Sequence, residues 1–239
     1  MPKPIVIPLP LTSFHENMLD GLEFCRLTYT YFDEVCAQPN GGHVLRERKG
    51  PVKQLVEELL PICRYIHKFY RPGQYISVRW VYGNQSFDAK MEAKGFMVEN
   101  EMWPARGTLE ITQAVHRNEH LMRELLNSKG GGFSLNGLEA GKGKPGSREI
   151  TSECLSYDNH SYIDEMCVII LSAINAKIVK LESGDYPGDT TLIVGCSLTN
   201  VFYPSEWTKL VAMVKKSLPS NRFVRIFLVS DVGNYFAEL

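Results

Sequence analysis

Two apolar runs near the C-terminus constrain the fold of this 239-residue chain most strongly. Thr190 to Cys196 and Phe223 to Ser230 are rich in apolar and β-branched residues, a composition typical of strands buried on both faces of a sheet. The segment between them, Pro204 to Leu218, has apolar residues at helical spacing. A strand, a helix and a second strand in this order predict two strands joined by a right-handed crossover.

The preceding part of the chain alternates between helical and β-type patterns. Helical spacing is found in residues 18–36, in Pro51–Tyr70 with a kink expected at Pro61, in Gln113–Leu126, and from Asp158 or Asn159 to Leu181. Alternating, β-branched composition is found in Tyr75–Tyr82, Phe87–Ala93 and Thr108–Thr112. We therefore expect an α/β protein with a mixed central sheet flanked by helices, its core in the order α-β-β-β-α-β.

The domain organisation follows from the same patterns. Residues 1–50 are expected to form an N-terminal extension whose leading helix packs on the core, and residues 51–239 the α/β core itself. Within the core, residues 127–148 hold seven of the 19 glycines together with Lys129, Lys142, Lys144 and Arg148. This composition predicts a long flexible loop, and loops of such length are often functional.

The second and third β-type segments carry acidic residues in a recognisable pattern. They read Ser86-Phe87-Asp88-Ala89-Lys90 and Leu109-Glu110-Ile111-Thr112. Together with the element order, these residues resemble the PD-(D/E)XK nuclease superfamily, which has a restriction-endonuclease-like fold. The resemblance implies that Asp88 and Glu110 bind a divalent metal ion, Mg²⁺ or Mn²⁺, and that a lysine two residues after the second acid helps to activate water. Position 112 is threonine, so this chain departs from the pattern at that point.

A lysine elsewhere can replace the missing cation, because members of the superfamily relocate it to the following helix. Lys177 falls within about 20° of Ile170 on a helical wheel, inside the apolar stripe of the long helix. A lysine in that position must extend to water or meet carboxylates, and Asp88 and Glu110 are its natural partners. Lys180 on the same helix and Lys90 beside Asp88 are the second and third candidates.

The superfamily also often adds a glutamate from the first core helix. Glu58 lies about 100° from the centre of the apolar stripe at Leu59, whereas Glu57 points nearly to the opposite side. Glu58 is therefore the fourth candidate for a catalytic residue, after Asp88, Glu110 and Lys177. The alternative to a catalytic role for Glu58 is a solvated side chain on an amphipathic helix.

The resulting hypothesis is a divalent-metal-dependent phosphodiesterase that acts on DNA or RNA, with activity retained, weakened or lost according to what replaces the lysine at Thr112. Hard Mg²⁺ prefers carboxylate oxygens, and a bound metal ion polarises the phosphate and lowers the pKa of water. The alternative is a binding or assembly module on the same fold without catalysis. Apolar surface on the leading helix would then contact a partner or a second copy in a homodimer.

A different motif, His116-Arg117-Asn118-Glu119-His120, reads H-x-x-E-H. In inverzincin metallopeptidases two histidines one turn apart hold zinc and the glutamate acts as a base. The helical pattern places His116 and His120 on the solvated side, and the segment around Glu182, a possible downstream carboxylate, does not resemble the second motif of that family. A surface helix with solvated histidines is therefore the expectation, and a zinc metallopeptidase is the second alternative.

Net charge and hydropathy argue against a polybasic nucleic-acid binder and against a membrane-spanning protein. The chain has 26 basic and 27 acidic residues, so nucleic acid would have to meet local clusters, such as Arg46, Arg48, Lys49 and Lys53 or the lysines of residues 127–148. No apolar run approaches the length of a membrane span, and the N-terminus lacks the features of a signal peptide. The six cysteines show no CxxC spacing, which is typical of reduced thiols. We therefore expect a cytoplasmic protein.

Overall fold

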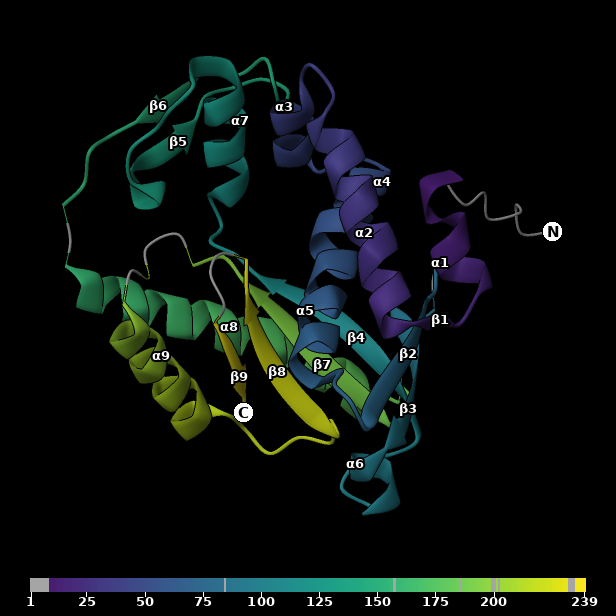
Figure 1. Cartoon of the computed structure of the whole chain (residues 1–239). Coiled ribbons are helices and arrows are strands. Elements are labelled where there is room, and N and C mark those ends of the chain that lie inside the picture. The colour runs from purple at the N-terminus through teal and green to yellow at the C-terminus, as the bar shows by residue number, and fades with distance from the viewer. Residues whose placement is uncertain are drawn as a thin grey trace.

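The computed structural model describes residues 9–83, 85–156, 158–184, 186–198, 201, 203–231 and 235–239. These residues form a central sheet of seven strands in the order β1-β2-β3-β4-β7-β8-β9 (Figure 1). The strands are β1 (Leu19–Asp20), β2 (Gln74–Trp80), β3 (Ala89–Gly95), β4 (Arg106–Ala114), β7 (Thr190–Cys196), β8 (Arg225–Ser230) and β9 (Phe236–Glu238).

The sheet has an antiparallel half and a parallel centre. Strands β1 to β4 form an antiparallel meander, β4, β7 and β8 are parallel neighbours, and β9 runs antiparallel to β8. Every residue of β7 is buried, as expected for a strand with parallel neighbours on both sides and helices on both faces. The predicted α/β fold with a mixed central sheet flanked by helices is therefore confirmed.

Two layers of helices cover the sheet, as Figure 1 shows. One face carries α2 (Gly21–Cys36) and the continuous helical segment formed by α4 (Pro51–Gln54), η2 (Leu55–Leu59) and α5 (Leu60–Phe69). Their apolar sides pack against Ile76, Val78, Leu109 and Ile111 of the sheet. The other face carries α8 (Asn159–Glu182) and α9 (Pro204–Ser217), which pack on Leu192, Val194, Ile226 and Leu228. The helical segment from Pro51 to Phe69 and helix α8 bury the apolar stripes that their sequences predict, whereas α2 buries Phe24, Cys25 and Val35 and leaves Leu22 and Tyr29 exposed.

The first core helix contains a π-helical turn, η2, where the sequence predicts a kink at Pro61. Within η2 the backbone N–H of Leu60 donates to the carbonyl of Leu55, five residues earlier. Pro61 follows this turn directly, and the carbonyl of Glu57, four residues before it, accepts from the Gln113 amide at 2.6 Å in place of the missing N–H. The wider turn changes the direction of the side chains before Pro61, which include Glu57 and Glu58.

The segment after β4 differs from the prediction. Residues 113 and 114 belong to β4, and helix α7 (Glu119–Lys129) begins only after a short connection, because β4 extends to keep its pairing with β7. Residues 127–148 are not all loop: they hold the end of α7, a 3-10 turn η3 (Leu135–Gly137) and β5 (Leu138–Ala140), which pairs with β6 (Ile150–Ser152). Leu121, Leu125, Leu138 and Ile150 form a small core for this group.

Short elements complete the described chain. They are η1 (Leu9–Leu11), α1 (Thr12–Glu16), α3 (Gly41–Glu47) and α6 (Phe96–Glu99). In Figure 1, α3 lies next to α7 and the β5–β6 hairpin at one end of the molecule, above the carboxyl ends of the parallel strands. Among the helices in the described ranges, none combines the length and the apolar character that crossing a membrane requires.

Candidate active site

Asp88 and Glu110 are held side by side where the ladder between β3 and β4 ends. The register pairs Ala89 with Leu109, and the N–H of Asp88 donates to the carbonyl of Leu109 at 2.9 Å. Two residues further along β4, the N–H of Ile111 donates to the Asp88 carboxylate at 2.7 Å. Because Leu109 and Ile111 flank Glu110, the two acids are cross-strand neighbours.

Glu110 lies at the centre of the site and is 5% exposed. Its Oε1 atom forms an ion pair with Nζ of Lys177, which reaches the sheet from α8. The same oxygen accepts a hydrogen bond of 3.0 Å from the hydroxyl of Tyr186, in the turn that leads to β7. Two donors from different elements therefore hold this carboxylate in one orientation.

Glu58 brings a third carboxylate to the site from η2. Its Oε2 atom accepts a hydrogen bond of 2.7 Å from the indole Nε1 of Trp80, the last residue of β2. Burial raises the pKa of Glu58; the Trp80 hydrogen bond opposes this effect, and the charges of Glu57 and Glu110 add to it. In the structure Glu58 therefore faces the other acids rather than solvent.

The group has more acids than cations, and this excess of negative charge affects the pKa of Asp88 most. Removal from water, followed by the charges of Glu110 and Glu58, raises the pKa of Asp88 to about 8. The hydrogen bond from Ile111 and the ammonium of Lys177 act in the opposite direction without cancelling the increase. A carboxyl group with such a pKa, close to a second acid and a lysine, is characteristic of sites that bind a cation or perform acid–base chemistry.

Of the three candidate lysines, Lys177 is the one that pairs with Glu110. Lys180, three residues further along α8, is exposed. Lys90 is exposed on β3, and its ammonium lies 5.8 Å from the centre of the Phe87 ring. Thr112, two residues after Glu110, adds no charge. Lys177 is thus the cation that the structure brings to the two acids.

A divalent metal ion fits the donor chemistry of Asp88 and Glu110. Mg²⁺ is commonly held by one or two carboxylates, with water and substrate phosphate oxygens as its other ligands. The described residues contain no group of three or more His, Cys, Asp or Glu side chains placed to hold a metal ion together. The third carboxylate of the site, Glu58, is held by Trp80.

The H-x-x-E-H motif does not form a two-histidine face in the described chain. Helix α7 begins at Glu119, so His116 precedes the helix that contains His120. Glu119 pairs with Arg123 at 3.6 Å. Without two histidines on successive turns of one helix, this segment lacks the geometry by which the motif binds zinc.

The expectation of two solvated histidines is wrong for His116, which is 7% exposed. Its Nε2 lies 2.8 Å from Oδ1 of Asn136 and 3.3 Å from Oε1 of Glu165, and its Nδ1 accepts from the N–H of Asn118. Burial arises because the chain folds back through η3 over the connection between β4 and α7. His116 therefore joins this loop to α8, whereas His120 is exposed.

Two residues of the site are absent from the sequence-based candidates. Trp80 is a core residue at the end of β2, and its buried indole N–H requires an acceptor, which Glu58 supplies. Tyr186 lies immediately before Pro187 in the turn that enters β7. A tyrosine in a turn beside a buried strand gives no sequence signal for its partner, because the pairing with Glu110 depends on the tertiary fold.

Comparison of the chain with protein-family models, with curated proteins and with solved structures finds no match.

Proposed function

We propose that this protein is a divalent-metal-dependent phosphodiesterase that cleaves nucleic acid at the site formed by Asp88, Glu110 and Lys177. The observation that carries the proposal is the meeting of two cross-strand carboxylates with a single ammonium from α8, at the positions that the resemblance to the PD-(D/E)XK superfamily implies. The antiparallel strands β2 to β4, the parallel strand β7 and the helices α5 and α8 support the corresponding α-β-β-β-α-β core.

Each residue has a chemical role in this proposal. Asp88 and Glu110 would hold Mg²⁺ or Mn²⁺, which when bound supplies polarisation of the phosphate and a water of lowered pKa. The Lys177 ammonium stabilises negative charge that develops beside Glu110, as the lysine of the superfamily does. The Tyr186 hydroxyl orients Glu110, and Glu58 adds negative charge that favours a cation.

A groove lies near the carboxylates. It has a volume of about 300 Å³, and its lining includes Phe87, next to Asp88, and Pro187, next to Tyr186. Two cations, Lys90 and Arg106, line it together with two acids, Glu92 and Asp189, and the exposed guanidinium of Arg106 is 3.4 Å from Glu92. A phosphate backbone in this groove would contact the two cations independently of base sequence.

The test is cleavage of single- and double-stranded DNA and RNA in the presence of Mn²⁺ or of EDTA. We expect cleavage by the native protein only with the metal ion, and a loss of about a hundredfold or more in Asp88→Ala and Glu110→Ala. Glu182→Ala, an exposed acid at the end of α8, is the matched control and should cleave as the native protein does. Equal activity of the native protein and the two site variants would reject the assignment.

The second candidate function is that of a binding module on the same fold. The uncharged Thr112 favours this candidate. Metal binding separates the two candidates without an activity assay. A site formed by Asp88 and Glu110 should raise the free energy of unfolding by about 2.7 kcal/mol when Mn²⁺ is at a hundred times its dissociation constant. Thermal unfolding with and without Mn²⁺ measures this effect, and Asp88→Ala should remove it. An unchanged melting temperature of the native protein would favour the binding module.

A further inference from the structure

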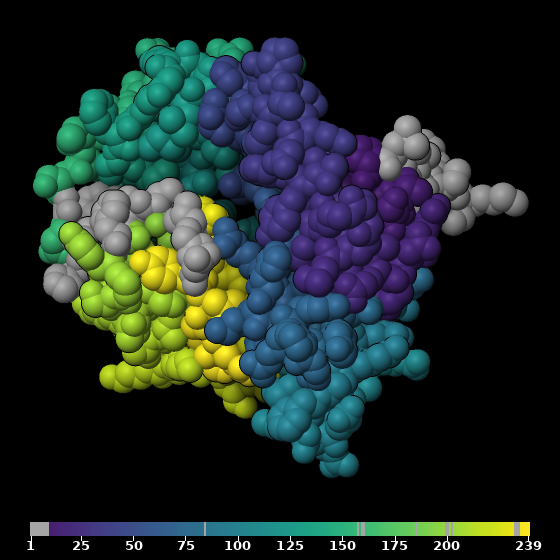
Figure 2. Space-filling view, in the orientation of Figure 1, coloured from purple at the N-terminus to yellow at the C-terminus, as the bar shows by residue number. Residues whose placement is uncertain are grey.

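A second cavity lies where the three parallel strands end. It has a volume of about 480 Å³, and its floor includes Gln113 of β4, Gly195 at the end of β7, and Ser230 of β8. In Figure 2 the surface is hollowed between the blue and teal segments that contain α3 and α7 and the yellow end of β8. Open α/β sheets commonly bind ligands in the crevice at the carboxyl ends of parallel strands, so the cavity occupies a favourable place in the fold.

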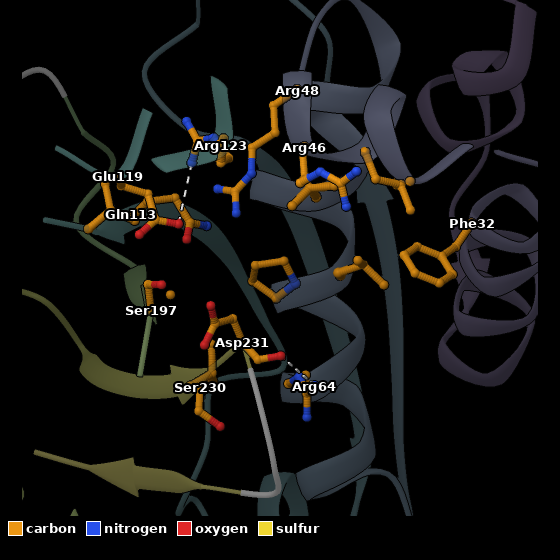
Figure 3. A pocket seen from close by; sticks show the side chains of 18 of the residues that line it. Phe32, Arg46, Arg48, Arg64, Gln113, Glu119, Arg123, Ser197, Ser230 and Asp231 are labelled. Atoms are coloured by element: carbon orange, nitrogen blue, oxygen red, sulfur yellow. Dashed lines mark hydrogen bonds and ion pairs between the residues drawn. The ribbon is translucent and has the colours of Figure 1, made fainter. Parts of the chain in front are cut away.

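Four arginines from separate parts of the chain line this cavity (Figure 3). They are Arg46 of α3, Arg48 at the end of α3, Arg64 of α5 and Arg123 of α7. Two acids, Glu119 and Asp231, line it as well. Glu119 is already paired with Arg123, and Oδ1 of Asp231 accepts from the N–H of Leu198 at 3.0 Å. The cavity therefore carries an excess of positive charge.

Two polar groups at the cavity need a further partner. Ser197 is 7% exposed, and its hydroxyl makes no hydrogen bond with any residue that the structure describes. Nη1 of Arg123 is buried and likewise makes no hydrogen bond within the described chain, since its ion pair with Glu119 spans 3.6 Å. Burial lowers the pKa of the Arg123 guanidinium, and the nearby charge of Arg48 lowers it further. An anion with several acceptor oxygens would satisfy these groups.

The opposite wall of the cavity is apolar. Tyr29 and Phe32 of α2, Val56 of η2 and Leu60 of α5 line it. A small inorganic anion would leave this wall in contact with water, whereas a ligand with a planar ring would cover it. The volume is within the range of about 300 to 1,000 Å³ that is usual for small-molecule sites. We propose that the cavity binds a free nucleoside phosphate, with its phosphate at Arg48, Arg123 and Ser197 and its base against the apolar wall.

This site is distinct from the carboxylate site and does not depend on its function. Gln113 lies three residues beyond Glu110 on β4, and successive side chains of a strand alternate between faces, so the two point to opposite sides of the sheet. The Gln113 amide donates to the carbonyl of Glu57 at 2.6 Å, and Glu57 forms an ion pair of 3.7 Å with Arg48. Helix segment η2 lines the cavity through Val56, whereas its Glu58 is bonded to Trp80 at the carboxylate site.

Isothermal titration calorimetry in EDTA tests the proposal with AMP, ATP, GTP, CTP and UTP, with adenosine and inorganic phosphate as partial ligands. We expect at least one nucleotide to bind at least tenfold more tightly than adenosine or phosphate alone. Arg48→Gln and Arg123→Gln should each weaken that binding by about tenfold or more. Arg26→Gln, on the exposed side of α2, is the matched control and should bind as the native protein does.

Two further variants keep the result interpretable. Ser197→Val replaces a hydroxyl that has no partner in the described chain, so it should keep the native melting temperature and weaken nucleotide binding. Asp88→Ala should bind the nucleotide as tightly as the native protein, whether or not the protein is a nuclease. Absence of binding at millimolar nucleotide, or native affinity in the folded Arg48 and Arg123 variants, would overturn the proposal. So would binding of a 5′-phosphorylated oligonucleotide without binding of any free nucleotide.

Discussion

Replacement of Lys177 by methionine should lower the free energy of unfolding by about 3 kcal/mol at pH 8. The Lys177 and Glu110 side chains are 19% and 7% exposed, so their ion pair is largely removed from water. Methionine keeps the length of the apolar stem but, among the residues that the structure describes, leaves Glu110 with the Tyr186 hydroxyl as its one side-chain donor.

Urea unfolding of the metal-free protein measures this loss, and two variants identify its cause. Glu110→Gln in addition to Lys177→Met should restore most of the stability, because the buried charge that loses its partner in Lys177→Met is then removed as well. Lys180→Met, on the exposed side of the same helix, should stay within about 0.5 kcal/mol of the native value. If Lys177→Met unfolds at the native urea concentration, the ion pair has no energetic importance and Lys177 is not held at the site.

Periodicity predicts the position of Lys177, whereas Asp88 and Glu110 are candidates because of the resemblance to the PD-(D/E)XK superfamily. Lys177 shares the helical stripe of Ile170 and Ile174, which must face the sheet. An ionisable group placed by an apolar pattern has few positions available to it. The strand from Thr190 to Cys196 is predicted with the bounds that the structure has, for the same reason.

The arginine cavity could not be found in this way, because no single period connects its parts. The sequence indicates a basic cluster at Arg46 and Arg48, but Arg64 and Arg123 join them only through the packing of α3, α5 and α7. Arg48 also has a left-handed backbone, with φ of 49°, which is uncommon for a residue other than glycine. The predicted helix Gln113–Leu126 would even place Gln113 outside the sheet. Its true position at the end of β4 follows from pairing with β7.

Replacement of Asp88 by asparagine should stabilise the metal-free protein at alkaline pH, by an amount on the order of 3 kcal/mol. The pKa of Asp88 is raised from 3.8 to about 8 by burial and by the charges of Glu110 and Glu58. Between these values the folded protein binds a proton that the unfolded chain has released. The free energy of unfolding therefore falls as the pH rises through this window, by at most about 1.4 kcal/mol per pH unit from this group.

Asparagine has no proton to release at this position, and its amide oxygen can still accept from the N–H of Ile111. The difference in stability between Asp88→Asn and the native protein should therefore grow from pH 5 to pH 8 and then level off. Urea unfolding in EDTA across this range measures it, with Glu182→Gln as the matched exposed control. Parallel pH curves for the native protein and Asp88→Asn would contradict the raised pKa. Addition of Mn²⁺ should reverse the order, because only the native carboxylate gains a cation, and a residue that lowers stability until its ligand binds is characteristic of a functional site.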